Sequence, residues 1–256
     1  MRASGDIEKD VRVALEHDPR LNPQRSAIDV EMQSGAVRLA GEVESIEEKR
    51  AAVEVAKGID GVERIDDRLR VRPASALADD TLCDAVCRHL FEEPSFQGMT
   101  IHCAACGRDV LERTPHAPEG RIAVTVDGGV ITLSGEVVSR AHKRLAAVLA
   151  WWTPGCRNVI NALAVRPAGR DTDDEIRDAV ELVLNKDPIV HSGRIDAEVR
   201  DGRVTLRGTV ATREEKRLAE RDVWYIEGVR DVANALEVYE GPLDTEVTRA
   251  TPSGSG

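Results

Sequence analysis

The sequence predicts an α+β protein built from three tandem αββαβ domains, each a three-stranded mixed sheet with two helices on one face. The main observation is a short stretch that begins and ends with Gly and has apolar residues at alternate places. It occurs three times, at residues 35–41, 129–135 and 202–208. The spacing is constant, because Gly135 follows Gly41 by 94 positions and Gly208 follows it by 167. The protein is therefore an array of one repeated unit.

The first helix of the unit is clearest in the third copy. Asp173 or Asp174 can cap it, and Asp187 followed by Pro188 ends it, because a residue before proline avoids the α region. Its apolar residues recur at helical spacing and form one stripe, Ile176, Ala179, Val180, Val183 and Leu184.

A β-hairpin comes next. Apolar residues alternate over 195–199 and again over 204–208, and the turn dipeptide Asp201 and Gly202 lies between the two runs. This pattern is typical of two antiparallel strands joined by a tight turn.

The unit ends with a second helix and a last strand. Thr212 caps the helix, Gly228 ends it, and the apolar pattern over 232–238 predicts the strand. A helical return joins parallel strands, so the sheet has one antiparallel and one parallel pair. The predicted domains are residues 5–72, 78–166 with an insertion at 95–121, and 172–240, followed by a disordered tail at 241–256.

Composition excludes several classes of protein. The formal charge of -11 argues against nucleic acid and against a polybasic membrane anchor. The N-terminal residues carry no apolar segment of a signal peptide, and no stretch is apolar enough for a transmembrane helix. The chain as written is therefore expected in the cytoplasm, and in the periplasm if its start codon is misassigned.

Several motifs resemble the BON domain family. They are the Asp-Pro after the first helix, the G-x-V-x-L-x-G strand, the Gly-Val after the second helix, and the Asn-x-Leu-x-Val ending at 161–165 and 234–238. The first repeat departs from the last motif, with Asp67 in the place of Asn. The resemblance implies an αββαβ fold, no catalysis, and binding to phospholipid surfaces or envelope proteins. Family members usually carry a signal peptide or a lipoprotein anchor, and some are cytosolic, including one that binds potassium.

Glycines in a repeated motif raise the question of a phosphate-binding loop. Such a loop lies between a strand and a helix N-terminus. Gly41, Gly135 and Gly208 instead lie inside the second hairpin strand. We expect them to serve close backbone packing.

Four cysteines form a candidate zinc site. Alignment of the first helices places Cys83 and Cys87 where the other repeats have charged residues, so we expect both on a solvent-facing surface. Cys103 and Cys106 form a C-x-x-C pair in the insertion, which has little apolar content and is expected to be a loop. Four thiolates would complete a tetrahedral structural zinc site that holds the insertion on the helix.

Other roles for these cysteines remain open. They can be metal-free thiols, a C-x-x-C disulfide in an oxidising compartment, or residues without a role in a dispensable loop. The fifth cysteine, Cys156, takes the place of a core valine and is expected to be buried.

Two aromatic pairs are candidates for a ligand or partner surface. Trp151 and Trp152 occupy the same positions in the second repeat as Trp224 and Tyr225 in the third. Exposed Trp and Tyr suit a membrane interface or a protein contact. The alternative is that the rings close the core of each repeat or a contact between neighbouring repeats.

The sequence contains no catalytic constellation, so we expect no enzyme activity. The leading hypothesis is a binding protein that presents its repeats to phospholipid or protein partners in an envelope or osmotic stress response. The alternatives are a zinc-stapled or metal-responsive cytosolic scaffold and a potassium-binding or other ion-binding stress protein. Apart from the possible zinc ion, no cofactor is expected.

Overall fold

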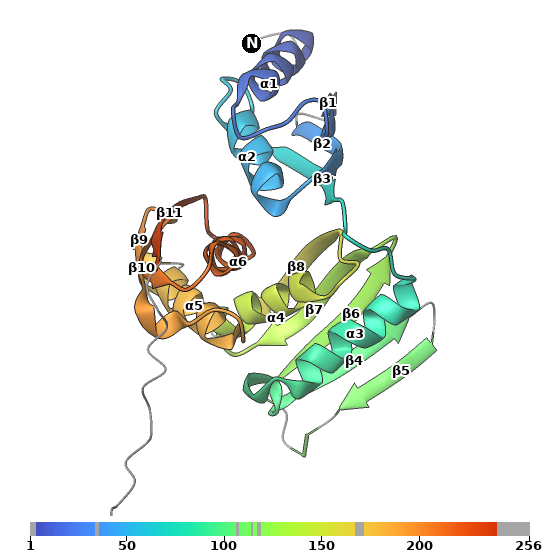
Figure 1. Cartoon of the computed structure of the whole chain (residues 1–256). Helices are drawn as coiled ribbons and strands as arrows, with labels where there is room; N and C mark the ends of the chain where they lie inside the picture. Colours follow the sequence, from blue (N-terminus) through green and yellow to red (C-terminus); the bar gives the residue numbers. More distant parts are fainter. Residues whose placement is uncertain are drawn as a thin grey trace, which may run out of the picture.

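The computed structural model describes residues 4–33, 36–105, 108–113, 115–116, 119–166 and 172–239. The tail predicted at 241–256 lies outside these residues. Three lobes follow one another along the chain and meet in the middle of the molecule, coloured blue, green and orange in Figure 1. The α+β prediction is confirmed, with three mixed sheets.

The first repeat has the predicted element order. Its elements are α1 (Ser4–His17), β1 (Ala27–Gln33), β2 (Ala36–Val43), α2 (Ile46–Lys57) and β3 (Ile65–Val71). The sheet order is β1-β2-β3, with β1 antiparallel and β3 parallel to β2. The third repeat repeats this arrangement with α5 (Asp173–Lys186), a 3-10 turn η2 (Ser192–Arg194), β9 (Ile195–Arg200), β10 (Arg203–Val210), α6 (Arg213–Trp224) and β11 (Asp231–Val238).

The second repeat differs, because its sheet has five strands in the order β5-β4-β6-β7-β8. Its elements are α3 (Asp79–Glu92), η1 (Pro94–Phe96), β4 (Met99–Ala105), β5 (Arg108–Arg113), β6 (Gly120–Asp127), β7 (Val130–Val137), α4 (Arg140–Trp152) and β8 (Asn158–Val165). The predicted three-stranded sheet is present as β6, β7 and β8. The insertion, which we expected to be a loop, adds β4 and β5 to the edge of β6.

Glycine inside the second hairpin strand is required by close backbone contact, as predicted. Gly208 has φ +124°, in the region that favours glycine, and a Cβ atom there would overlap the carbonyl oxygen of Arg194, the residue just before β9. Gly135 makes the same approach to Arg121. The repeated Gly therefore leaves room for the backbone at the start of the neighbouring hairpin strand.

A neighbouring lysine explains why the first repeat has Asp67 in the place of the Asn that begins the Asn-x-Leu-x-Val motif. The Lys49 side chain is buried, and its Nζ atom donates to Asp67 Oδ1 and to the Leu69 carbonyl oxygen, both at 2.7 Å. Burial lowers the pKa of Lys49, and the Asp67 carboxylate opposes this. In the third repeat the same position is Asn234, whose Nδ2 donates to the Lys216 carbonyl oxygen at 2.9 Å. Asp67 thus supplies a counter-charge that Asn cannot.

Each helix pair covers one face of its sheet and encloses a core, but the cores are not three separate clusters. The first repeat has its own, centred on residues such as Val11, Leu39 and Leu69. The buried residues of the second and third repeats form one continuous cluster, which also takes in Ile46 from α2. The second and third lobes are therefore packed together, with α4 against α5.

Candidate functional site

The predicted solvent exposure of Cys83 and Cys87 is wrong. Both side chains are fully buried on α3. In the described parts of the other repeats, the equivalent helix faces have no strand beyond the hairpin, whereas α3 packs on the added strand β4. The insertion itself changes the environment of that helix face. Alignment with the helices of the other repeats therefore wrongly predicted that the face is exposed to solvent.

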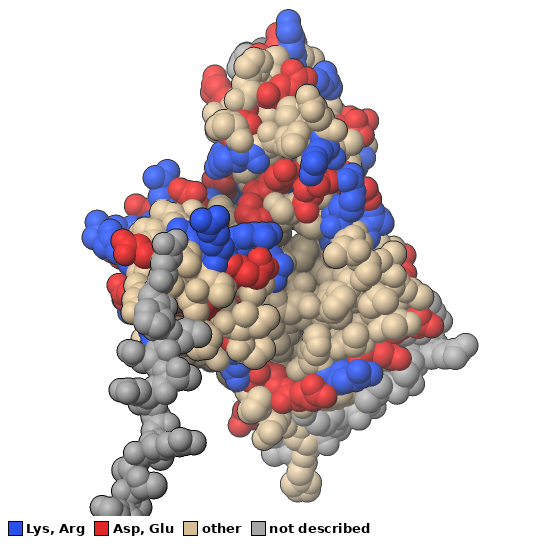
Figure 2. All heavy atoms as spheres, viewed as in Figure 1, with Lys and Arg blue, Asp and Glu red and all other residues tan. Residues whose placement is uncertain are grey.

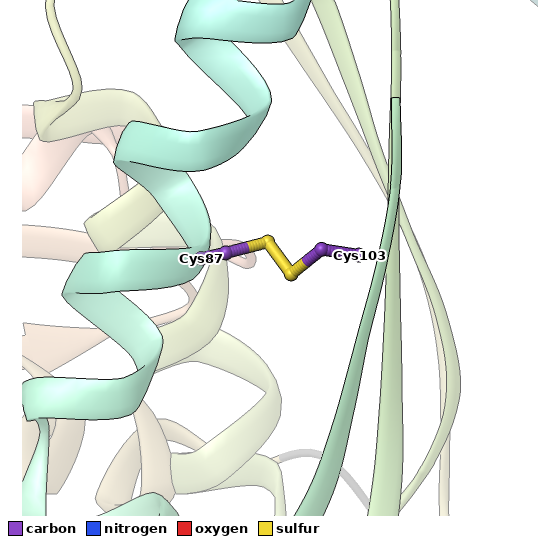
Figure 3. Close-up of a disulfide and its surroundings, with 2 residues drawn as sticks. All are labelled: Cys87 and Cys103. Atoms are coloured by element: carbon purple, nitrogen blue, oxygen red, sulfur yellow. A yellow bond between two sulfur atoms is a disulfide. The ribbon is translucent and has the colours of Figure 1, made fainter. Parts of the chain in front are cut away.

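Cys87 and Cys103 form a disulfide that joins α3 to β4 (Figure 3). Their Cα atoms are 6.4 Å apart, within the usual range. These two sulfur atoms are bonded to each other, so they are not the thiolates that the zinc hypothesis needs. Cys106 lies outside the described residues, and the C-x-x-C disulfide considered above is wrong, because Cys103 is bonded to Cys87. Over the described ranges, no three His, Cys, Asp or Glu side chains are close enough together to hold a metal ion, and zinc is not supported.

The insertion also contributes to the core, contrary to the expectation of little apolar content. Phe96, Met99, Ile101 and Cys103 are all fully buried. The last three alternate along β4, and this period of two is the signal that could have identified the strand. Cys156 is buried, as expected, and burial raises the pKa of its thiol to about 12.

The aromatic pairs lie where the second and third repeats meet. The rings of Trp151 and Tyr225 stack across this contact, with centroids 5.4 Å apart and planes 10° apart. Trp224 is buried and Trp152 is half-buried. The rings are thus placed as in the alternative in which they close a contact between repeats.

Trp152 makes a polar contact across the same boundary. Its indole Nε1 donates to Asp222 Oδ1 at 2.8 Å, and Asp222 is fully buried. Burial raises the pKa of Asp222 to about 8, and contact with the Asp187 carboxyl acts in the same direction, whereas the Trp152 N–H opposes it. Asp222 is therefore protonated at neutral pH, which allows two carboxyl groups to lie together.

Residues without a sequence signal complete this boundary. Arg144 is buried on α4, and its Nε donates to the Glu227 carbonyl oxygen at 2.8 Å. Lys186 at the end of α5 donates to Glu93 Oε1 at 2.7 Å. The second and third repeats are therefore held by charge-assisted hydrogen bonds as well as by the shared core.

The first repeat is joined to the second by strand ends. The Val71 N–H donates to the Arg157 carbonyl oxygen at 2.7 Å, and the Arg157 guanidinium pairs with Glu42 on β2. The linker after β3 is thereby fixed beside the start of β8.

A cleft of about 540 Å³ opens where all three repeats meet, and it is the candidate functional site. Figure 2 shows the surface hollowed between the lobes, with mostly uncharged surface on the side of the second repeat. The first repeat contributes Ile46 and Arg72 to the wall, the second contributes Trp152, and the third contributes Ile189 and Tyr225. Burial raises the pKa of Tyr225 to about 12, so its hydroxyl stays protonated and can donate a hydrogen bond. The cleft has the size and the mixed lining of a ligand site at a domain boundary.

Two comparisons with known proteins bear on this fold. A family model described as BON domain matches residues 3–73, 108–167 and 172–240. Osmotically-inducible protein Y of Escherichia coli (strain K12) is 34% identical over 122 residues, which are 45% of this chain and 61% of that protein. The chain thus spans less than two thirds of the length of this curated relative.

Solved structures give only a distant likeness. The C-terminal domain of CdsD, a structural protein of the type III secretion system of Chlamydia trachomatis, is 14% identical with a TM-score of 0.24. The alignment covers 93% of this chain and 100% of that one. The PrgH periplasmic domain is 11% identical with a TM-score of 0.24, covering 91% and 100%. Over the described residues, every helix is too short or too polar to cross a lipid bilayer.

Proposed function

The chain belongs to the BON domain family, and from this premise we propose that it is a non-enzymatic binding protein of an osmotic or envelope stress response. The cleft between its three repeats is the proposed place of binding. The observation that carries this proposal is the composition of the wall, to which every repeat contributes an apolar side chain. No single repeat could form such a site alone. The proposed domains are residues 5–72, 78–166 and 172–240, and the second of these includes α3.

The partner that we propose is a protein segment rather than a phospholipid surface. A formal charge of -11 opposes approach to anionic lipid. The aromatic rings line a recess and stack on one another, whereas membrane anchoring needs rings that project into the interface. An apolar segment with a few polar groups suits a wall that mixes Trp152 and Ile189 with Arg72.

An oxidising compartment fits the disulfide. Buried disulfides persist outside the cytoplasm and are rare inside it. The Cys87–Cys103 bond therefore supports the periplasmic alternative over the cytoplasmic one.

The test places a photo-crosslinking amino acid at position 189 in cells grown at high osmolarity. Ile189 lines the cleft and is 55% exposed, and the control is position 160, because Ile160 is 45% exposed on β8 and does not line the cleft. We expect a discrete protein adduct from position 189 and none from position 160, and loss of the partner when Ile189→Asp places a charge in the wall.

Flotation with anionic vesicles separates the two partner classes. The parent protein should stay unbound. Flotation that Ile189→Asp abolishes would assign the cleft to phospholipid instead. Equal adducts from positions 189 and 160, without flotation, would show that the cleft binds neither.

A further inference from the structure

The second repeat shows what an added strand does to this fold. Strand β4 lies parallel to β6, with Ile101 opposite Ile122 and Cys103 opposite Val124. It occupies the groove between α3 and the edge of the hairpin, and Cys103 is bonded to Cys87 of α3. Helix α3 and the edge of β6 together form a groove that holds one more strand.

The first repeat has the same groove, and over its described residues no strand occupies it. By the constant spacing, Ile28 and Val30 of β1 correspond to Ile122 and Val124 of β6. Strand β1 is the outermost strand of its sheet. A cavity of about 270 Å³ opens beside it, and Leu15, Leu21 and Ile28 contribute apolar surface to its lining. This cavity shares no lining residue with the junction cleft.

Among the residues that the structure describes, side chains of α1 satisfy the outer edge of β1 at two places. Arg12 Nη2 donates to the Val30 carbonyl oxygen at 3.3 Å, and the Met32 N–H donates to Glu8 Oε1 at 2.6 Å. Because backbone groups alternate along a strand, Ile28 turns its N–H and C=O to the same edge. An incoming strand can replace these two contacts with a backbone ladder.

The register of β4 against β6 predicts which residue of a segment bound in the first repeat, here called the guest, lies beside which residue of the groove. The residues that correspond to Met99 and Ile101 lie beside Ser26 and Ile28, next to the cavity. The residue that corresponds to Cys103 lies beside Val30 and faces position 12, which is Arg12 here and Cys87 in the second repeat. The guest thus needs apolar, apolar and acidic side chains at alternate places.

We propose that the groove between α1 and β1 binds an extended segment of a partner protein as a fourth strand, parallel to β1. The segment presents two apolar side chains to the cavity and an acidic one to Arg12. The third repeat disfavours this guest, because Glu181 stands at the place of Arg12 and would repel the acid. The site is separate from the junction cleft and does not depend on it.

The first test uses a probe taken from this chain. A labelled peptide of residues 97–105 with Cys103→Glu is titrated with the full-length protein, and binding is followed by fluorescence anisotropy. We expect saturable binding that weakens at least about tenfold with Arg12→Glu. A peptide with Cys103→Lys should restore binding to that variant. Arg12→Gln, which keeps the polar contact but not the charge, should bind each peptide with an affinity between those of the parent and of Arg12→Glu.

The second test traps the register. In the variant Arg12→Cys, the peptide with its natural Cys103 should form an intermolecular disulfide, the counterpart of Cys87–Cys103, in a glutathione buffer whose oxidised form takes up the two electrons. Val13→Cys on the solvent side of α1 is the matched control. Peptide mapping should place the adduct at position 12, formed at least about tenfold faster than at position 13.

Three results would overturn the proposal. One is anisotropy that does not saturate, and another is equal trapping at positions 12 and 13. The third is an Arg12→Cys homodimer that forms in preference to the peptide adduct, because the occupant would then be a second copy of this chain.

Discussion

The indole N–H of Trp152 in the second repeat donates a 2.8 Å hydrogen bond to the Asp222 carboxyl in the third. Asp222 is fully buried, and Asp187 approaches it from the end of α5. An ionised pair would be strongly unfavourable there. The Asp222 carboxyl at the contact between the two repeats is thus in its protonated form.

Stability should consequently fall as the pH rises from about 4 to about 8. The pKa of Asp222 is about 8 in the folded protein and near 3.8 in the unfolded chain. Below 3.8 both states are protonated, and between the two values only the unfolded chain releases the proton, which favours unfolding. Asp222→Asn avoids this cost and keeps an acceptor for Trp152 and a donor for Asp187.

We expect Asp222→Asn to be more stable than the parent at pH 8 by on the order of 2 kcal/mol, or about 4–8 °C in Tm. The gain should vanish near pH 4, as measured by differential scanning calorimetry. Asp178→Asn, at an exposed position on α5, is the control and should show no such trend. A lower Tm for Asp222→Asn at pH 8 would mean that the folded protein needs the ionised group.

The disulfide predicts a simple mass difference. The sequence has five cysteines, and two of them are joined. Protein alkylated under denaturing conditions should therefore gain two more labels after reduction than before it. Because the bond closes a loop with a sequence separation of 16, replacing both residues with Ser should cost about 3 kcal/mol by denaturant unfolding. Equal label numbers with and without reductant would rule out the bond.

Substitution of the strand glycine Gly208 should be far more harmful than that of Gly193 in the 3-10 turn η2. Gly208→Ala places a Cβ against the Arg194 carbonyl oxygen at a positive φ, and we expect a loss of at least about 2 kcal/mol. Gly193→Ala meets nothing within 4 Å and serves as the control within the same repeat. Urea denaturation of both variants measures the difference, and similar midpoints would contradict it.

A helix-to-turn contact that the second and third repeats share should also contribute to stability. Asp173 at the start of α5 accepts from the Asp201 and Gly202 N–H groups at 2.7 and 3.0 Å. Asp79 does the same for Gly128 and Gly129. Asp173→Asn keeps the size but loses the charge and one acceptor, so we expect a cost of about 1–2 kcal/mol in urea.

The adjacent residue is the control for this prediction. The side chain of Asp174 is 78% exposed and pairs with Arg177 at 3.1 Å. Asp174→Asn should change stability by less than about 0.5 kcal/mol, as is usual for surface ion pairs. Equal costs for the two variants would leave the turn contact without a special role.

The repeated unit was predictable because it is encoded locally. Alternating residues, turn dipeptides and the glycine at positions such as 208 report the strands, and the constant spacing shows that one fold serves three times. The environment of Cys87 was not predictable in this way. It depends on β4, which in the sequence looks like a polar insertion because only alternate residues of one strand are buried.

The contacts between repeats were also beyond sequence reasoning. Arg144 has the same place in its helix as Arg50 and Arg217, yet it reaches the Glu227 carbonyl oxygen in the next repeat. Trp152 could be identified as unusual, but its acceptor Asp222 could not, since the two are far apart in the chain. Such pairs follow from how whole repeats pack and leave no periodic pattern.

The second and third repeats share one hydrophobic cluster. The unit that is repeated in the sequence is therefore not the unit that unfolds cooperatively. The buried residues of these two repeats pack against one another, so unfolding of either repeat would expose the core of the other to water. The two repeats should therefore unfold in a single transition. The first repeat has a cluster of its own and can open without them. The motifs define three repeats, but calorimetry should then show two unfolding units.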